Sequence, residues 1–182
     1  LADFVAPETQ FGKAGDFMGA FAVTVDGLEA PIAQFEAQHD DYNKILLQAL
    51  ADRLVEAAAE CLHYRVRTQI WAYAADEHLS QEEIIKETYQ GIRPAPGYPA
   101  CPDHTEKIKL FELLEVEQNI GIRLTENLAM YPVSSVCGWY FAHPQSIYFG
   151  VGKIDATQTD DYAHRKHLPK AEIDKWLHHN YI

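Results

Sequence analysis

Apolar and polar positions recur with different periods along this chain, and the changes of period mark the expected elements. The short apolar run at 20–25 (AFAVTV) ends at Asp26-Gly27 and predicts a buried strand followed by a turn. From 32 to 71, apolar residues return at three- and four-residue steps, which predicts helix. Because about forty residues is long for one helix, we expect a break near His39, Asp40 and Asp41.

The long helical stretch is predicted to have one apolar and one polar face. The apolar stripe that we expect to face the core consists of Leu47, Leu50, Leu54, Ala57 or Ala58, and Cys61. The polar face consists of Lys44, Gln48, Asp52, Glu56, Glu60 and His63.

Capping residues predict shorter helices further along the chain. The sequence 80–83 (SQEE) is a capping box, so a helix should run from there to about Tyr89. Asp103 with Glu106 can cap the next helix, which should reach about Asn119 and carries Ile108, Phe111 and Leu114 as apolar residues. Two more helices are expected at about 157–166 and 169–178, the second opened by Pro169.

The segments 133–143 and 147–154 are rich in β-branched and aromatic residues and are joined by HPQS at 143–146. They predict an antiparallel hairpin, with Cys137, Trp139 and Phe141 on one face. Such an aromatic hairpin is core in most proteins, and in a minority it holds a planar ligand. Because strands and helices do not alternate regularly, the sequence favours an α+β fold.

Composition and charge narrow the function classes. The 182 residues are 47% hydrophobic and 23% charged, which is typical of a globular domain, and the net charge is −12. A surface that tracks phosphates needs clustered Lys and Arg, so we expect no nucleic acid partner. Acidic residues could instead face a basic protein or a cationic ligand, or simply be solvated. Three scattered cysteines predict no disulfide framework and favour a cytoplasmic setting, and no apolar run approaches the ~18 residues of a membrane span.

A proline-rich loop at 91–102 (GIRPAPGYPACP) is the sharpest candidate for a binding site. Its prolines fix φ, so the loop is stiff and preshaped. Arg93 offers a planar charged fork for a carboxylate or phosphate, Gly97 lets a ligand approach the backbone, and Tyr98 adds an aromatic face. The alternative is a packed structural loop in which Arg93 pairs with Glu87 or another acid.

Cys101 and His104 have the spacing of half a zinc site, and the histidines 178–179 could contribute to it. A structural zinc site needs four ligands, and the second half-motif is missing, so we expect no metal. The sequence also lacks the Walker loop, G-x-G-x-x-G, G-x-S-x-G and H-E-x-x-H motifs, which removes the usual support for nucleotide-binding and hydrolase functions.

The segment 91–107 (GIRPAPGYPACPDHTEK) resembles the R-P-A-P-G-Y-P-A-C-P signature of the activation domain family of cobalamin-dependent methionine synthase. Four further stretches match this family in order, namely AFAVT at 20–24, FEAQHDDYNKI at 35–45, LTEN-AM-P at 124–132 and GWYFAHPQS-YF at 138–149. Together they cover nearly the whole chain.

The resemblance implies a C-shaped α+β module with a twisted antiparallel sheet and flanking helices. Residues 1–182 would form the C-terminal part of one activation domain whose upstream part, including an acidic cofactor contact, is absent. The implied function is to bind S-adenosylmethionine and to transfer its methyl group to cob(I)alamin, which reactivates the methyltransferase. The implied cofactor-binding residues are Arg93, which holds the carboxylate, with Ala95, Gly97, Tyr98, Tyr148 and Phe149.

The implied cofactors are S-adenosylmethionine and cobalamin, the latter carried by another module of the full-length protein. The implied partners are that module and a flavodoxin-like reductase, and Asp52 and Glu56 are candidates for meeting the module. No catalytic side chain is expected, because the cofactors supply the reactivity, and the fragment alone is not expected to be active. Cys137 stands where many relatives have a small hydroxyl residue. The competing function is a non-catalytic docking module for a corrinoid protein or a flavodoxin-like electron donor.

Overall fold

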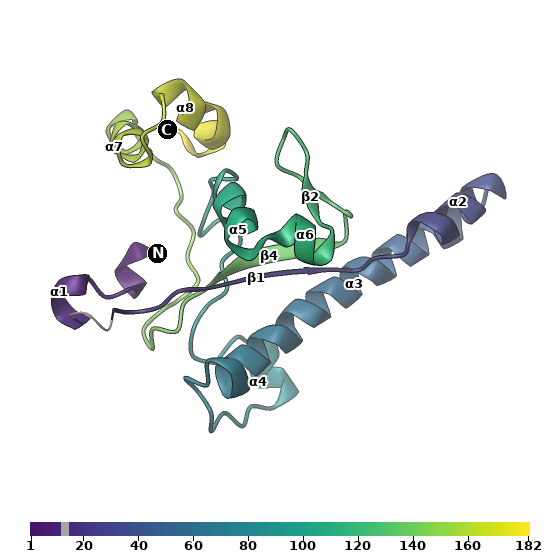
Figure 1. The fold of residues 1–182 in the computed structure, drawn as a ribbon, viewed down its shortest axis with the longest axis horizontal. Helices are drawn as coiled ribbons and strands as arrows, with labels where there is room; N and C mark the ends of the chain where they lie inside the picture. The colour runs from purple at the N-terminus through teal and green to yellow at the C-terminus, as the bar shows by residue number, and fades with distance from the viewer. Residues whose placement is uncertain (12–14) are drawn as a thin grey trace.

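The computed structural model describes residues 1–11 and 15–182. Helices and short strands alternate irregularly along these residues (Figure 1). The elements are η1 (Ala2–Phe4), α1 (Glu8–Phe11), β1 (Gly19–Thr24), α2 (Glu29–Ala37), α3 (Asp41–Arg65), η3 (Val66–Ile70), α4 (Gln81–Ile85), α5 (Glu106–Leu114), α6 (Val116–Ile120), β2 (Arg123–Leu124), β3 (Met130–Tyr131), β4 (Ser135–Tyr140), α7 (Ala156–Lys166), α8 (Lys170–Leu177) and η4 (His178–Asn180). The expected α+β class is confirmed, because residues 1–11 and 15–182 contain two small antiparallel sheets with flanking helices.

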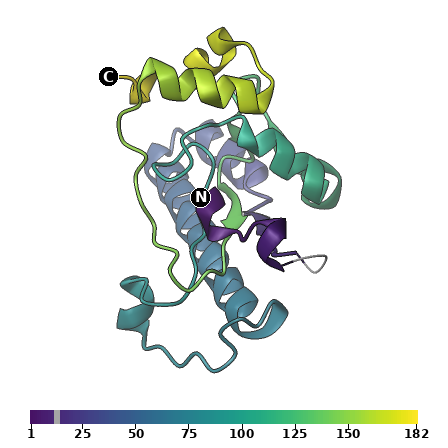
Figure 2. The same cartoon turned by 90° about the vertical axis from the view of Figure 1, so that its left-hand side faces the viewer.

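The strands β1 and β4 form the central sheet, and helices cover both of its faces (Figures 1 and 2). Their antiparallel register runs from Gly19 opposite Tyr140 to Thr24 opposite Ser135. One face packs on α5 and α6 in a core of Ile92, Leu110, Val116, Ile122, Cys137, Trp139 and Phe141. The other packs on α3 in a core of Phe21, Ala59, Val66 and Tyr140. The alternation predicted for 136–141 is therefore confirmed, because odd and even positions enter different cores.

The predicted hairpin is wrong, since β4 pairs with β1 and the described residues 147–153 form no strand. This segment instead leads away from the sheet towards α7 and α8, and the backbone N–H of Val151 donates to the Pro99 carbonyl at 2.8 Å. Alternating apolar residues identified a strand correctly, but periodicity carries no information about which strand is its neighbour.

The long helical stretch is broken where the sequence predicted, because α2 ends at Ala37 and Asp40 caps α3 by accepting from the Asn43 N–H at 3.1 Å. The predicted core face of α3 is wrong. Its buried residues are Ala51, Val55, Ala59 and His63. Leu50 and Leu54 remain about half exposed, and Cys61 is exposed. Small side chains at four-residue spacing let α3 approach the sheet closely, whereas the bulkier leucines lie outside that contact.

Two of the shorter helices end earlier than expected. The Ser80–Glu83 capping box is present, yet α4 ends at Ile85 rather than near Tyr89. The predicted cap of α5 by Asp103 is wrong: Thr105 is the N-cap and makes no side-chain cap bond, and Asp103 instead accepts from the Thr105 N–H at 2.7 Å in the preceding turn. That helix stops at Leu114 because Glu115 adopts a left-handed conformation, and α6 follows. The two C-terminal helices are confirmed as α7 and α8, with Pro169 at the N-cap of α8.

None of the helices in the described residues combines the length and the apolarity needed to cross a bilayer.

Candidate cofactor-binding site

The proline-rich loop is fixed beside β4 by backbone hydrogen bonds. Ile92 and Phe141 exchange N–H to carbonyl bonds at 3.0 Å in both directions, and the Trp139 N–H donates to the Pro94 carbonyl at 2.9 Å. Pro94 and Pro96 are fully buried. Because prolines lose little conformational entropy on folding, this loop is an ordered wall next to the sheet.

A tight turn at Gly97 projects Tyr98 away from the loop. Gly97 has φ +92°, and a Cβ there would lie 2.3 Å from the His104 ring, so both the backbone conformation and the space require glycine. The turn is closed by the Gly97 N–H, which donates to the Cys101 carbonyl at 2.7 Å. Tyr98 is 60% exposed as a result and is available to a ligand.

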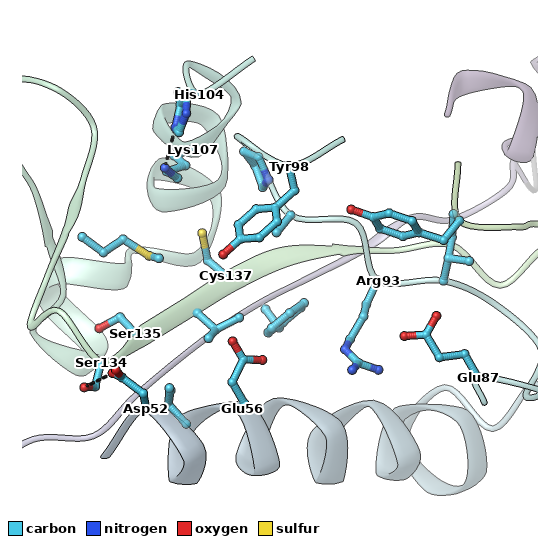
Figure 3. A pocket seen from close by; sticks show the side chains of 18 of the residues that line it. Asp52, Glu56, Glu87, Arg93, Tyr98, His104, Lys107, Ser134, Ser135 and Cys137 are labelled. Carbon is cyan, nitrogen blue, oxygen red and sulfur yellow. Dashed lines mark hydrogen bonds between the residues drawn. The ribbon is translucent and has the colours of Figure 1, made fainter. Parts of the chain in front are cut away.

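A cavity of about 1090 Å³ lies between this loop, the sheet and α3 (Figure 3). Figure 3 shows Asp52 and Glu56 entering from α3, Arg93 reaching down towards that helix, and Tyr98 above the sheet. The lining mixes carboxylates, cations and aromatic groups, among them Asp52, Arg53, Glu56, Lys86, Glu87, Tyr89, Arg93, Tyr98, Lys107 and Tyr148. A cavity of this size, with polar groups converging on it, fits a nucleoside-sized ligand.

Three side chains hold the Arg93 guanidinium at one end of the cavity. Nη1 donates to the Tyr89 hydroxyl at 2.8 Å and to His63 Nδ1 at 3.2 Å, and Nη2 lies 2.6 Å from Glu60 Oε2. Burial, together with the charges of Arg67 and Arg93, lowers the pKa of His63 to about 2, so this ring is neutral and accepts at Nδ1. Its Nε2–H then faces the Tyr73 hydroxyl at 3.3 Å.

Lys107 occupies the other end of the cavity, close to Cys137 (Figure 3). Its Nζ donates to the Leu128 carbonyl at 2.8 Å and contacts His104 Nδ1 at 2.9 Å. Burial lowers the pKa of Lys107 and raises that of the Cys137 thiol to about 11. The thiol is therefore protonated at neutral pH, which fits packing rather than nucleophilic chemistry.

A family model described as "Vitamin B12 dependent methionine synthase, activation domain" matches residues 1–167. This chain belongs to that family. It is also similar to a crystal structure described as the MetH reactivation domain bound to AdoHcy, with 58% sequence identity and a TM-score of 0.92. The match covers 99% of this chain and 55% of the solved one, so the chain spans about half the length of that structure.

Within this activation domain, the structure brings together four of the six residues predicted to bind the cofactor. The cavity is lined by Arg93, Ala95, Tyr98 and Tyr148. The other two do not line it. Gly97 lies against the His104 ring, and Phe149 packs edge-on against Phe4 with ring centroids 6.4 Å apart. The binding roles of all six residues stay predictions. Arg93 does pair with an acid, which is Glu60 and not Glu87.

Cys101 and His104 belong to no metal-binding cluster in the part of the chain that the structure describes. Within residues 1–11 and 15–182, no three His, Cys, Asp or Glu side chains are placed to hold a metal ion. Burial and the nearby carboxylates of Glu106 and Asp103 raise the pKa of Cys101 to about 12, which disfavours the thiolate that zinc requires.

The sequence did not indicate the residues that surround Arg93 or the buried lysine. Glu60 and His63 lie on the face of α3 that was predicted to be solvated, and Tyr89 was placed at a helix end. The one available signal was the spacing of Ala51, Val55, Ala59 and His63, because small residues at four-residue steps mark a close helix contact. Nothing in the sequence pattern distinguished Lys107 from a solvated lysine.

Proposed function

We propose that this activation domain binds S-adenosylmethionine in the cavity beside the proline-rich loop and presents its methyl group to cobalamin carried by another module. In this reaction the carbon–sulfur bond of the sulfonium breaks, the methyl group passes to cob(I)alamin, and S-adenosylhomocysteine leaves. The cavity with Arg93 held at one end is the observation that carries the proposal. It is supported by the 58% identical reactivation domain, which is described as bound to AdoHcy.

The residues of this chain bind and orient S-adenosylmethionine, and none has to transfer a proton. Arg93 is the carboxylate clamp, because a guanidinium forms paired hydrogen bonds with a carboxylate. Glu87 lines the cavity and offers negative charge to the ammonium group of the ligand. Tyr98 and Tyr148 add aromatic walls. Fixing both ends of the ligand is a proximity effect, which in well-aligned cases lowers a barrier by up to about 7–11 kcal/mol.

The partners that we propose are the cobalamin-binding module of the same enzyme and a flavodoxin-like reductase that supplies one electron. Asp52 and Glu56, which lie one turn apart on α3 at the cavity, would meet the cobalamin module. We place the protein in the cytoplasm, in line with its three free cysteines, since reducing compartments keep thiols unpaired.

Calorimetric titration of S-adenosylmethionine into the complete protein tests the proposal, with Arg93→Ala beside the wild type. Loss of one charged hydrogen-bond partner should weaken binding by at least about tenfold. The control is Arg165→Ala, which removes an equal charge from an exposed pair with Asp161 and should leave affinity unchanged. A wild type that does not bind, or an Arg93 variant that binds equally well, would contradict the proposal and favour a docking role.

A further inference from the structure

The carboxylate that holds Arg93 approaches it from outside the cavity. Glu60 and His63 both lie on α3, and neither lines the cavity, whereas Arg93 and Tyr89 do. The 2.6 Å contact between Glu60 Oε2 and Arg93 Nη2 therefore does not stand in for a bound ligand. It is a permanent counter-charge behind the group that faces the ligand.

Glu60 also belongs to a short chain of alternating charges. Its Oε1 lies 4.0 Å from Nη1 of Arg67, a residue with no exposed surface. Arg67 in turn donates from Nε and Nη2 to both oxygens of Glu77, at 2.7 and 2.8 Å. The order is Glu77, Arg67, Glu60, Arg93, so two negative and two positive charges balance.

The neutral histidine beside this chain adds no charge to the balance. His63 contacts Arg93 but stays unprotonated, as its low pKa shows. Glu60 Oε1 and Arg67 Nη1 have no hydrogen-bond partner among the described residues, although both atoms are buried. Glu60 and Arg67 are therefore held together by charge more than by hydrogen bonds. The four charged side chains have no net charge.

We propose that Glu60 is a specificity-determining residue that cancels the charge of Arg93, so that the cavity accepts a carboxylate only from a ligand that carries its own positive charge. This inference rests on the proposed function. A ligand that brings a carboxylate alone adds one uncompensated negative charge beside Glu60 and close to the cavity carboxylate Glu87 (Figure 3). An α-amino acid group brings an ammonium with its carboxylate and leaves the local charge balanced.

Three ligands that differ in their carboxylate and ammonium groups test this charge selection in the complete protein. S-adenosylhomocysteine carries a carboxylate and an ammonium, its analogue without the amino group carries only the carboxylate, and 5′-methylthioadenosine carries neither. The wild type should bind S-adenosylhomocysteine at least about tenfold more tightly than the carboxylate-only analogue.

Glu60→Gln keeps a hydrogen-bond acceptor beside Arg93 and removes the charge. It should tighten binding of the carboxylate-only analogue by about tenfold or more. Binding of S-adenosylhomocysteine should change little, because greater attraction for its carboxylate is offset by lost attraction for its ammonium. Binding of 5′-methylthioadenosine should not change. Glu112→Gln, at an exposed position on α5 that does not line the cavity, makes the same charge change and serves as the control.

If Glu60 has only a structural role, Glu60→Gln should shift the affinities for all three ligands by the same factor. That result would overturn the inference, as would weaker binding of the carboxylate-only analogue. If Glu60→Gln does not fold, the wild type still decides, since equal affinity for S-adenosylhomocysteine and the carboxylate-only analogue would show that no charge selection exists. Failure of the proposed function looks different again, because then the wild type binds none of the three ligands.

Discussion

His63 is a fully buried histidine whose ring makes contacts on three sides. Arg93 donates to its Nδ1, Tyr73 lies at its Nε2, and the Tyr140 ring stacks on it with centroids 5.1 Å apart. Burial comes first among the causes that lower its pKa to about 2, followed by the charges of Arg67 and Arg93. The folded state therefore keeps this ring neutral at neutral pH.

Stability should consequently fall with acid. The unfolded chain takes up a proton at this histidine below its ordinary pKa of 6.5, whereas the folded chain does so only near 2. Between pH 7 and pH 5 this one group should cost about 2 kcal/mol of unfolding free energy. Urea unfolding at both pH values measures it, and His63→Gln should reduce the acid loss by that amount. The exposed His164→Gln serves as the control, and an equal acid loss in wild type and His63→Gln would contradict the assignment.

Single site residues could be predicted where the surrounding sequence excludes regular secondary structure. Arg93 and Tyr98 were found because four prolines in nine residues exclude helix and central strand around them. His63 was missed because a polar residue on a helix was assumed to face water. Its burial depends on partners from 73, 93 and 140, which lie far from it along the chain and carry no local signal.

The helix α3 serves two functions with two sets of side chains. Ala59 packs in the core beside the sheet, while Asp52, Val55 and Glu56 line the cavity. The Ser134 hydroxyl donates to Asp52 Oδ1 at 2.6 Å and ties the helix to the segment ahead of β4. The break before this helix could be predicted from the length of the helical stretch, but its end at Arg65 and its buried face could not. Small residues carry little weight in a hydrophobic pattern.

Reversing both carboxylates on α3 tests whether they meet the cobalamin module. The double variant Asp52→Lys with Glu56→Lys should weaken docking to the separately prepared module by at least about tenfold, since complementary charges at an interface become like charges. Glu112→Lys with Glu117→Lys makes the same change in net charge at exposed positions near α5 and α6. Docking would be measured by titration calorimetry. Equal affinity of the module for the wild type and both double variants would show that Asp52 and Glu56 do not contribute to the interface.

At the scale of the molecule, the two C-terminal helices form a small unit of their own (Figures 1 and 2). Ile154, Ala163, Ile173 and Leu177 make up its core. A polar junction joins it to the end of the proline-rich loop, where Lys166 Nζ donates to Asp103 Oδ2 at 2.7 Å and to Glu106 Oε1 at 2.8 Å. Burial alone would raise the pKa of Asp103, but its hydrogen bonds from Lys166, Thr105 and Tyr162 outweigh burial and lower it.

Lys166→Met should loosen this junction, because it leaves the buried Asp103 carboxylate without its cation. The expected loss is about 3 kcal/mol of unfolding free energy, with faster amide hydrogen exchange in α7 and α8. Arg165→Met is the matched control, since its ion pair with Asp161 is mostly exposed and should contribute little. Equal exchange rates in the two variants would show that the helices are held by apolar contacts instead.

The π-helix η3 has a consequence for how this family can change over time. It follows α3 directly, and the Trp71 N–H reaches back five residues to the Val66 carbonyl at 3.0 Å. Deleting one residue there would restore the α-helical period and rotate the chain on either side by about 100° relative to each other. Arg67 would then turn away from Glu77, and Tyr73 away from His63. Gaps in this short segment should therefore be rarer among relatives than substitutions, because its length matters more than its composition.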